Sequence, residues 1–161
     1  MTKHQERQKL IRYYKEITGI TDVDMKEVAK FAVAKLKWKL PTPTDPYDLL
    51  ARQLSESARE ETRYDKKTGR PYRANHQYTV NQSGQQMHLW IDIDEPAATR
   101  KKMHMSLTIR REQMVSDGVQ LTFDAEHWNF NHPTEEPLNM IMDLTDDIEW
   151  RKNADQMKEA S

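Results

Sequence analysis

The chain contains no cysteine, only four glycines and no long apolar run. The absence of cysteine excludes disulfides, thiolate zinc sites and cysteine nucleophiles. No apolar stretch approaches the roughly 20 residues that span a membrane, and no signal-peptide pattern opens the chain. The glycines never cluster, so the sequence has no glycine-rich phosphate loop, and the Gly-x-Ser-x-Gly motif is absent too. We therefore expect a cytoplasmic protein that has no membrane partner and no cofactor.

Apolar material is also scarce. Only 36% of the 161 residues are hydrophobic, while 32% are charged. Four Trp, six Tyr and three Phe still supply core residues, so the composition does not indicate wholesale disorder. The length suits one domain of ordinary size.

The formal net charge of −1 conceals a strong polarity along the chain. Residues 1–111 carry a net charge of +8, and residues 112–161 carry −9. Such asymmetry can mark a basic binding face or an acidic tail, whereas packing of the two parts against each other would cancel their fields. The low net charge alone therefore does not exclude a nucleic-acid-binding protein.

Apolar spacing predicts two N-terminal helices, over residues 4–18 and about 24–38. In the first, Leu10, Tyr14 and Ile17 lie on one face of a 3.6-residue period. Glycine follows directly and is a natural helix stop.

A proline-rich connector, LPTPTDP, follows these helices and disfavours further helix. Asp45 then caps a third helix with Pro46 at its first position, and this helix fades near Tyr64. The predicted organisation is an N-terminal helical region with its connector over 1–44, an α+β core over 45–151 and a polar tail over 152–161.

Alternating apolar residues predict an antiparallel hairpin. The strands run over 74–80 and 87–93, and NQSG turns the chain between them. A similar alternation over 138–144 predicts a third strand of the same sheet, although a helix is an alternative interpretation of that segment.

The segment between these strands also has two interpretations. Residues 103–109 alternate like a strand, and Asp117 with Gly118 is compatible with a hairpin turn. We favour one long amphipathic helix over 97–130, in which Gly118 is a weak point or a close-packing position. The favoured helix carries apolar residues at heptad spacing, namely Leu107, Met114, Leu121 and Trp128. The apolar side of this helix is most simply part of the core. If the helix extends beyond the small sheet, the seam would instead pair with a second copy of the chain and form a homo-oligomer through the long helix.

The resulting fold prediction is α+β, with N-terminal helices and a small antiparallel sheet packed on the long helix. Four segments then resemble an uncharacterised family of small bacterial and prophage proteins. They are REETRYDKKTGRPYRANH (59–76), LWIDIDE (89–95), RREQMVSDGVQLTFDAEHWN (110–129) and EEPLNMIMDLTDD (135–147). The resemblance covers about residues 45–150 and implies a phage or mobile-element setting without any mechanism. It also favours the helix over 97–130 and the strand over 138–144.

Asp92 and Asp94 form the most specific candidate for catalytic chemistry. Two residues apart on a strand, both carboxylates project from one face and have the oxygen ligands that Mg²⁺ prefers. A metal-dependent phosphoester enzyme would need them together with further acids and a base. Alternatively they face solvent, or pair with an arginine such as Arg73 or Arg100.

A basic and aromatic cluster is the main candidate for binding. Basic groups neutralise phosphates, tyrosine stacks on bases and asparagine can contact a base edge. Its predicted binding residues are Arg70, Tyr72, Arg73, Asn75, His76, Arg110 and Arg111. We expect a non-enzymatic binding or accessory protein whose partner is a protein or a nucleic acid. The alternatives are a dedicated nucleic-acid-binding protein and the metal-dependent enzyme, and a solvated loop and helix face would explain the same basic residues without any function.

Overall fold

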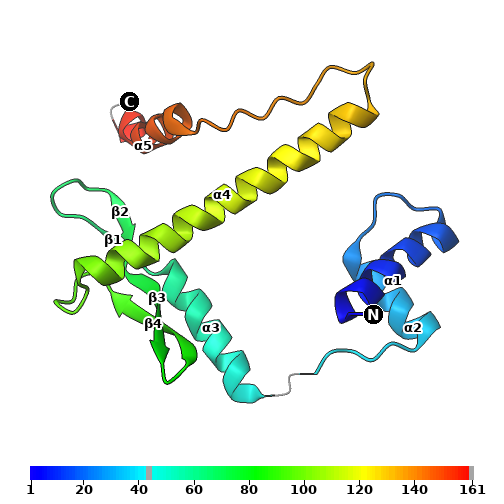
Figure 1. Ribbon diagram of the computed structural model, residues 1–161, viewed down its shortest axis with the longest axis horizontal. Coiled ribbons are helices and arrows are strands. Elements are labelled where there is room, and N and C mark those ends of the chain that lie inside the picture. The colour runs from blue at the N-terminus through cyan, green and yellow to red at the C-terminus, as the bar shows by residue number, and fades with distance from the viewer. Residues whose placement is uncertain (43–44, 160–161) are drawn as a thin grey trace. The chain divides into compact units, whose positions relative to one another are not determined.

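The computed structural model describes residues 1–42 and 45–159, and it has the α+β architecture expected from the sequence. The chain divides into two compact units, Met1–Gln53 and Leu54–Ser161. Figure 1 shows their elements along the chain. None of the described helices is long and apolar enough to cross a membrane.

The first unit is built on a pair of helices, α1 (Lys3–Thr18) and α2 (Met25–Leu36). Thr2 and Gln5 form a capping box at the start of α1, which ends at a glycine in the left-handed conformation. Tyr14 and Phe31 meet edge to face with ring centroids 5.2 Å apart. Tyr14 is buried together with two residues of α2, so both helices share one small core.

The second unit receives the end of α3 (Pro46–Glu60) and contains two antiparallel ribbons. The predicted hairpin is confirmed as β3 (Asn75–Gln82) paired with β4 (Gln85–Asp92). Ser83 and Gly84 turn the chain with φ angles of 51° and 77°, the left-handed conformations of a two-residue hairpin loop. The second ribbon, β1 (Thr62–Tyr64) with β2 (Pro71–Arg73), was not predicted.

One alanine joins the two ribbons. Ala74 separates β2 from β3 and is completely buried. Its N–H donates to the carbonyl of Glu61 at 3.0 Å, and its carbonyl accepts from the N–H of Ile93 at 2.8 Å. The short β1–β2 ribbon is therefore held by backbone hydrogen bonds directly beside the hairpin.

The long helix is confirmed as α4 (Arg100–Asn131), so a hairpin over this segment is excluded. Thr99 caps it through its side chain, which accepts from the N–H of Lys102. Its N-terminal part packs on β3, where Ser106 and Tyr78 are buried and the Lys102 ammonium lies 5.3 Å from the Tyr78 ring centroid. Figure 1 shows that the rest of α4 continues well past the hairpin.

The third strand predicted over 138–144 is wrong. The segment has no regular secondary structure. The backbone of its first residue, Leu138, forms hydrogen bonds with a side chain of α4 and does not pair with a strand. The Asn129 amide donates to the Leu138 carbonyl at 2.9 Å and accepts from the Leu138 N–H at 2.8 Å. A helix, α5 (Thr145–Glu159), follows and includes most of the predicted polar tail.

Tyr78 links the hairpin to α4, and Tyr78→Ala should destabilise the protein strongly. Removing a buried aromatic ring costs about 3 kcal/mol in the free energy of unfolding, because burial and packing are both lost. Tyr64→Ala is the matched control, since Tyr64 is 71% exposed and should change stability by less than about 0.5 kcal/mol. Urea unfolding followed by far-ultraviolet circular dichroism measures both, and equal losses would contradict the packing.

Candidate functional site

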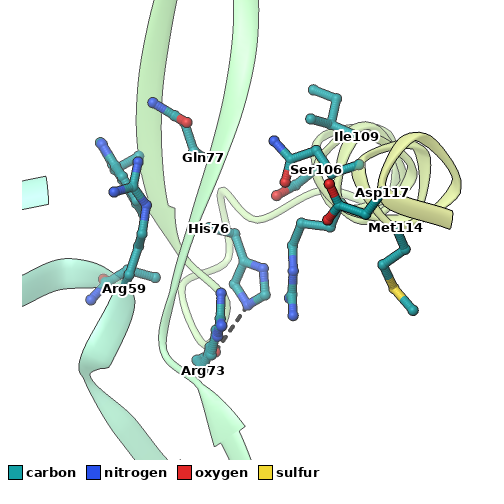
Figure 2. Close-up of a pocket in the computed structure, with 12 residues that line it drawn as sticks. Arg59, Arg73, His76, Gln77, Ser106, Ile109, Met114 and Asp117 are labelled. Atoms are coloured by element: carbon teal, nitrogen blue, oxygen red, sulfur yellow. Dashed lines mark hydrogen bonds between the residues drawn. The ribbon is translucent and has the colours of Figure 1, made fainter. Parts of the chain in front are cut away.

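A cleft of about 340 Å³ lies in the second unit, between the start of the hairpin and α4. We call it the arginine cleft, because three of its lining residues are arginines from three different elements. Its principal residues are Arg59, Arg73, His76, Gln77, Trp90 and Arg110. Figure 2 shows His76 at its centre, between Arg59 on one side and the residues of α4 on the other.

The three arginines lie in different surroundings, and none of them is paired with a carboxylate among the described side chains. The Arg59 guanidinium lies over the Trp90 ring, 5.5 Å from its centroid. Burial lowers the pKa of Arg110, and the positive charge of Arg73 lowers it further. Asp117 lines the α4 wall too, yet none of the three arginines forms an ion pair among the side chains that the structure describes. The cleft therefore concentrates positive charge next to a small apolar wall.

His76 holds the entrance of β3 in place. Its ring is buried, and Nε2 lies 2.9 Å from the carbonyl oxygen of Arg73, so Nε2 carries the proton and donates. The amide of Asn75 donates to the Ala58 carbonyl at 3.2 Å and to Glu61 Oε2 at 2.8 Å. His76 and Asn75 were both predicted as binding residues, and both line the cleft. Their hydrogen bonds are made to other parts of the protein, so these residues hold the walls of the cleft in position.

The other three predicted binding residues lie outside the cleft. Tyr72 donates its hydroxyl to Asp94 Oδ2 at 2.8 Å. Arg70 Nη2 lies 3.4 Å from Asn153 Oδ1. The pKa of Glu149 is lowered mainly by its hydrogen bond from Lys152, and the charge of Arg70 adds to this effect. Arg111 is exposed next to Glu112. The structure therefore brings together Arg73, Asn75, His76 and Arg110, and separates them from Arg70, Tyr72 and Arg111.

Asp92 and Asp94 surround the guanidinium of Arg63. Asp92 accepts two hydrogen bonds, from Nη1 at 2.8 Å and Nη2 at 2.7 Å, and Asp94 Oδ2 accepts from Nη1 at 2.8 Å. Hydrogen bonding to Arg63 lowers the pKa of both carboxylic acids. Both carboxylates thus serve an arginine on the neighbouring ribbon, and the described residues contain no group of three or more His, Asp or Glu that could hold a metal ion.

Three of the principal residues of the cleft were missed from the sequence, namely Arg59, Gln77 and Trp90. Arg59 lies in the last turn of α3. The sequence did not show which face of this helix would turn toward the hairpin. Trp90 pairs with Gln77 across the hairpin, on the face that the alternation pattern assigns to solvent. The polar face of a hairpin next to a basic loop is the signal that would have pointed to Gln77 and Trp90, whereas Arg59 lies on α3 and carries no such signal.

The hydrogen-bonded group of Arg63, Asp92 and Asp94 predicts that the free energy of unfolding depends on pH in the acidic range. Because Arg63 depresses both carboxyl pKa values in the folded state, its stabilising effect is complete above the ordinary Asp value of 3.8 and is lost as the pH falls through the lowered values. Arg63→Gln should therefore be less stable than the wild type at pH 7, and the difference should shrink below about pH 3.8.

Urea unfolding at a series of pH values measures that difference. Arg12→Gln, on α1 of the other unit, controls for the loss of one positive charge. Should the Arg63→Gln chain fail to fold, Asp94→Asn provides the same comparison. A stability difference that is constant from pH 7 to pH 2.5 would contradict the assignment.

Comparison of the chain with protein-family models, curated proteins and solved structures finds no match in any of the three. The arrangement of charges and contacts in the cleft is therefore the basis on which a function can be argued.

Proposed function

We propose that this chain is a binding protein that holds nucleic acid by its phosphate groups at the arginine cleft. The observation that carries the proposal is the gathering of Arg59, Arg73 and Arg110 without an ion-paired carboxylate among the described side chains. Like charges at such a site oppose each other, so an anion that enters the cleft removes the repulsion and gains attraction at once.

Arginine suits this role because of its shape. A guanidinium presents several N–H donors in a plane, which match two oxygens of one phosphate. Arg73 and Arg110 line the same cleft, and after burial the charge of Arg73 further lowers the pKa of Arg110, so a phosphate bound in the cleft would relieve this repulsion. Trp90 and Gln77 add an apolar surface and an amide for the sugar or base.

Basic residues beyond the cleft favour a polyanion over a small anion. Residues 65–111 carry a net charge of +5. Lys66 and Lys67 lie in the loop between β1 and β2, and Lys102 lies on α4 beside Tyr78. Several phosphates of one strand would be neutralised in turn, which gives a binding energy that depends on counterion release.

An acidic segment of another protein is the second ligand class that the same charges would accept. The phage or mobile-element setting implied by the sequence resemblance is compatible with either partner. Carboxylates, however, are single anionic ends on flexible side chains, whereas consecutive phosphates supply the regular spacing that a basic surface several residues long can follow. We therefore assign nucleic acid as the ligand.

Fluorescence anisotropy with labelled single-stranded and double-stranded oligonucleotides tests this assignment. We expect binding at low salt that weakens steeply as salt rises, since each phosphate contact releases a counterion. Arg73→Gln and Arg110→Gln should each weaken binding by about tenfold, because a charge-assisted hydrogen bond is worth roughly 1.5–3 kcal/mol. Each substitution should also reduce the salt dependence by about one phosphate contact.

Arg111→Gln is the matched control, since Arg111 is the neighbour of Arg110 on the same helix but does not line the cleft. Absence of binding to every oligonucleotide at low salt would overturn the proposal. Equal losses for Arg110→Gln and Arg111→Gln would show that the cleft is not the site. Binding of an acidic peptide with no binding of oligonucleotides would instead identify a protein ligand.

A further inference from the structure

The long helix leaves much of its apolar surface uncovered. Eight large apolar side chains of α4 are each at least 38% exposed. They are Leu107, Ile109, Met114, Val115, Val119, Leu121, Phe123 and Phe130. In contrast, the only buried residue of α4 is Ser106, against the hairpin. Exposed apolar area on this scale is typical of a surface that meets another protein.

Part of α4 is covered by the chain that returns along it. A Cβ added to Gly118 would lie 3.4 Å from Met142 Sδ, so the returning segment approaches the helix closely at this glycine. Asn129 binds the same segment at Leu138. Beside this contact lies an apolar groove of about 1010 Å³, whose walls include Val119 and Phe123 from α4.

Three of the exposed apolar residues form a stripe along one side of α4. Val119, Phe123 and Phe130 lie at positions i, i+4 and i+11, which share a face in a helix of 3.6 residues per turn. Their exposed fractions are 44%, 60% and 87%. The stripe therefore extends from the groove almost to the end of α4.

The charges of α4 are divided between its two halves. Residues 100–111 contain five basic residues and no acidic one, whereas residues 112–131 contain four acidic residues and no basic one. The helix is about 48 Å long at 1.5 Å per residue, so the two halves are far enough apart to act as separate charged surfaces.

We propose that a second copy of this chain packs antiparallel along α4, with the stripe of Val119, Phe123 and Phe130 at the interface. In the register that places the basic half of each helix against the acidic half of the other, the two-fold axis crosses near the middle of α4, and the stripe packs on the N-terminal half of the partner helix. Because the dimer has a two-fold axis, this pairing of basic and acidic halves occurs twice, and both chains use the same surface. A parallel arrangement would place like charges together at both ends.

The self-complementary pattern is what selects a second copy as the occupant. A different partner would have to supply both charges in the reverse order, whereas a copy of α4 supplies them by symmetry. The apolar stripe lies outside the arginine cleft, but the basic half of α4 includes Arg110, which lines the cleft. The interface is therefore tested first with substitutions in the stripe, which change no residue of the cleft.

Sedimentation velocity of the full chain from about 1 to 100 μM at low salt tests the proposal, because dimers form in this range for affinities of ordinary strength. We expect a mass of twice the 19.1 kDa of one chain. The Val119→Ser and Phe123→Ser double variant should sediment as a monomer at every concentration. Tyr64→Ser is the matched control, since it removes an exposed aromatic residue of β1 that is not part of α4 and should leave the dimer intact.

Charge reversal tests the orientation. One variant carries Lys101→Glu and another carries Glu126→Lys, because both residues lie on the helix face of the stripe. Each alone should dimerise at least tenfold more weakly than the wild type, and a mixture of the two should associate more tightly than either alone. In a parallel dimer each variant would relieve repulsion and associate more tightly than the wild type, which would overturn the antiparallel arrangement.

A wild-type mass that stays at that of one chain up to the highest concentration would overturn the interface itself, as would a trimer or larger assembly. If the serine variant fails to fold, the charge variants decide the question, because they replace exposed residues only.

Discussion

The hydrogen bonds from the Arg63 guanidinium to Asp92 and Asp94 are the constraint on which the site depends. Arg63 lies on the short β1–β2 ribbon, and the two carboxylates lie at the end of the hairpin, so three hydrogen bonds of 2.7–2.8 Å join the two ribbons. The ribbons are linked in sequence by Ala74 alone, which has no exposed surface. Arg73 is the residue before this junction, and it lines the same cleft as Arg110 of α4. A side-chain cluster with a structural role thus places the charges of the cleft.

The elements with a regular period were predictable from the sequence, and those without one were not. The hairpin and α4 are long enough for apolar residues to repeat at spacings of two or near four. The strands β1 and β2 have three residues each, too few to show any alternation. The strand expected over 138–144 was wrong because an alternating segment also suits an extended chain lying on a helix. There the side chain of Asn129 binds the backbone that a neighbouring strand would otherwise bind.

The candidate site was predictable only in part, for a related reason. Composition identified a basic segment, but it does not say toward which side each residue points. Arg70 and Arg73 are three residues apart, yet Arg70 approaches Asn153 of α5 whereas Arg73 lines the cleft. Arg59 and Trp90 come from α3 and β4, outside that segment, and their stacking is a tertiary contact. Sequence patterns report local faces, whereas a cleft is made where the faces of several elements meet.

The polarity of charge along the chain now separates into three local effects. At Arg70 the acidic C-terminal part approaches the basic ribbon, since Arg70 Nη2 lies 3.4 Å from Asn153 Oδ1 of α5. At Arg73 and Arg110 no ion-paired carboxylate is found among the described side chains, so the positive charge is left for a ligand. Along α4 the two signs follow each other on one rigid rod, where they cannot meet within a single copy. A chain with almost no net charge therefore keeps two charged surfaces, because its secondary structure holds the opposite charges apart.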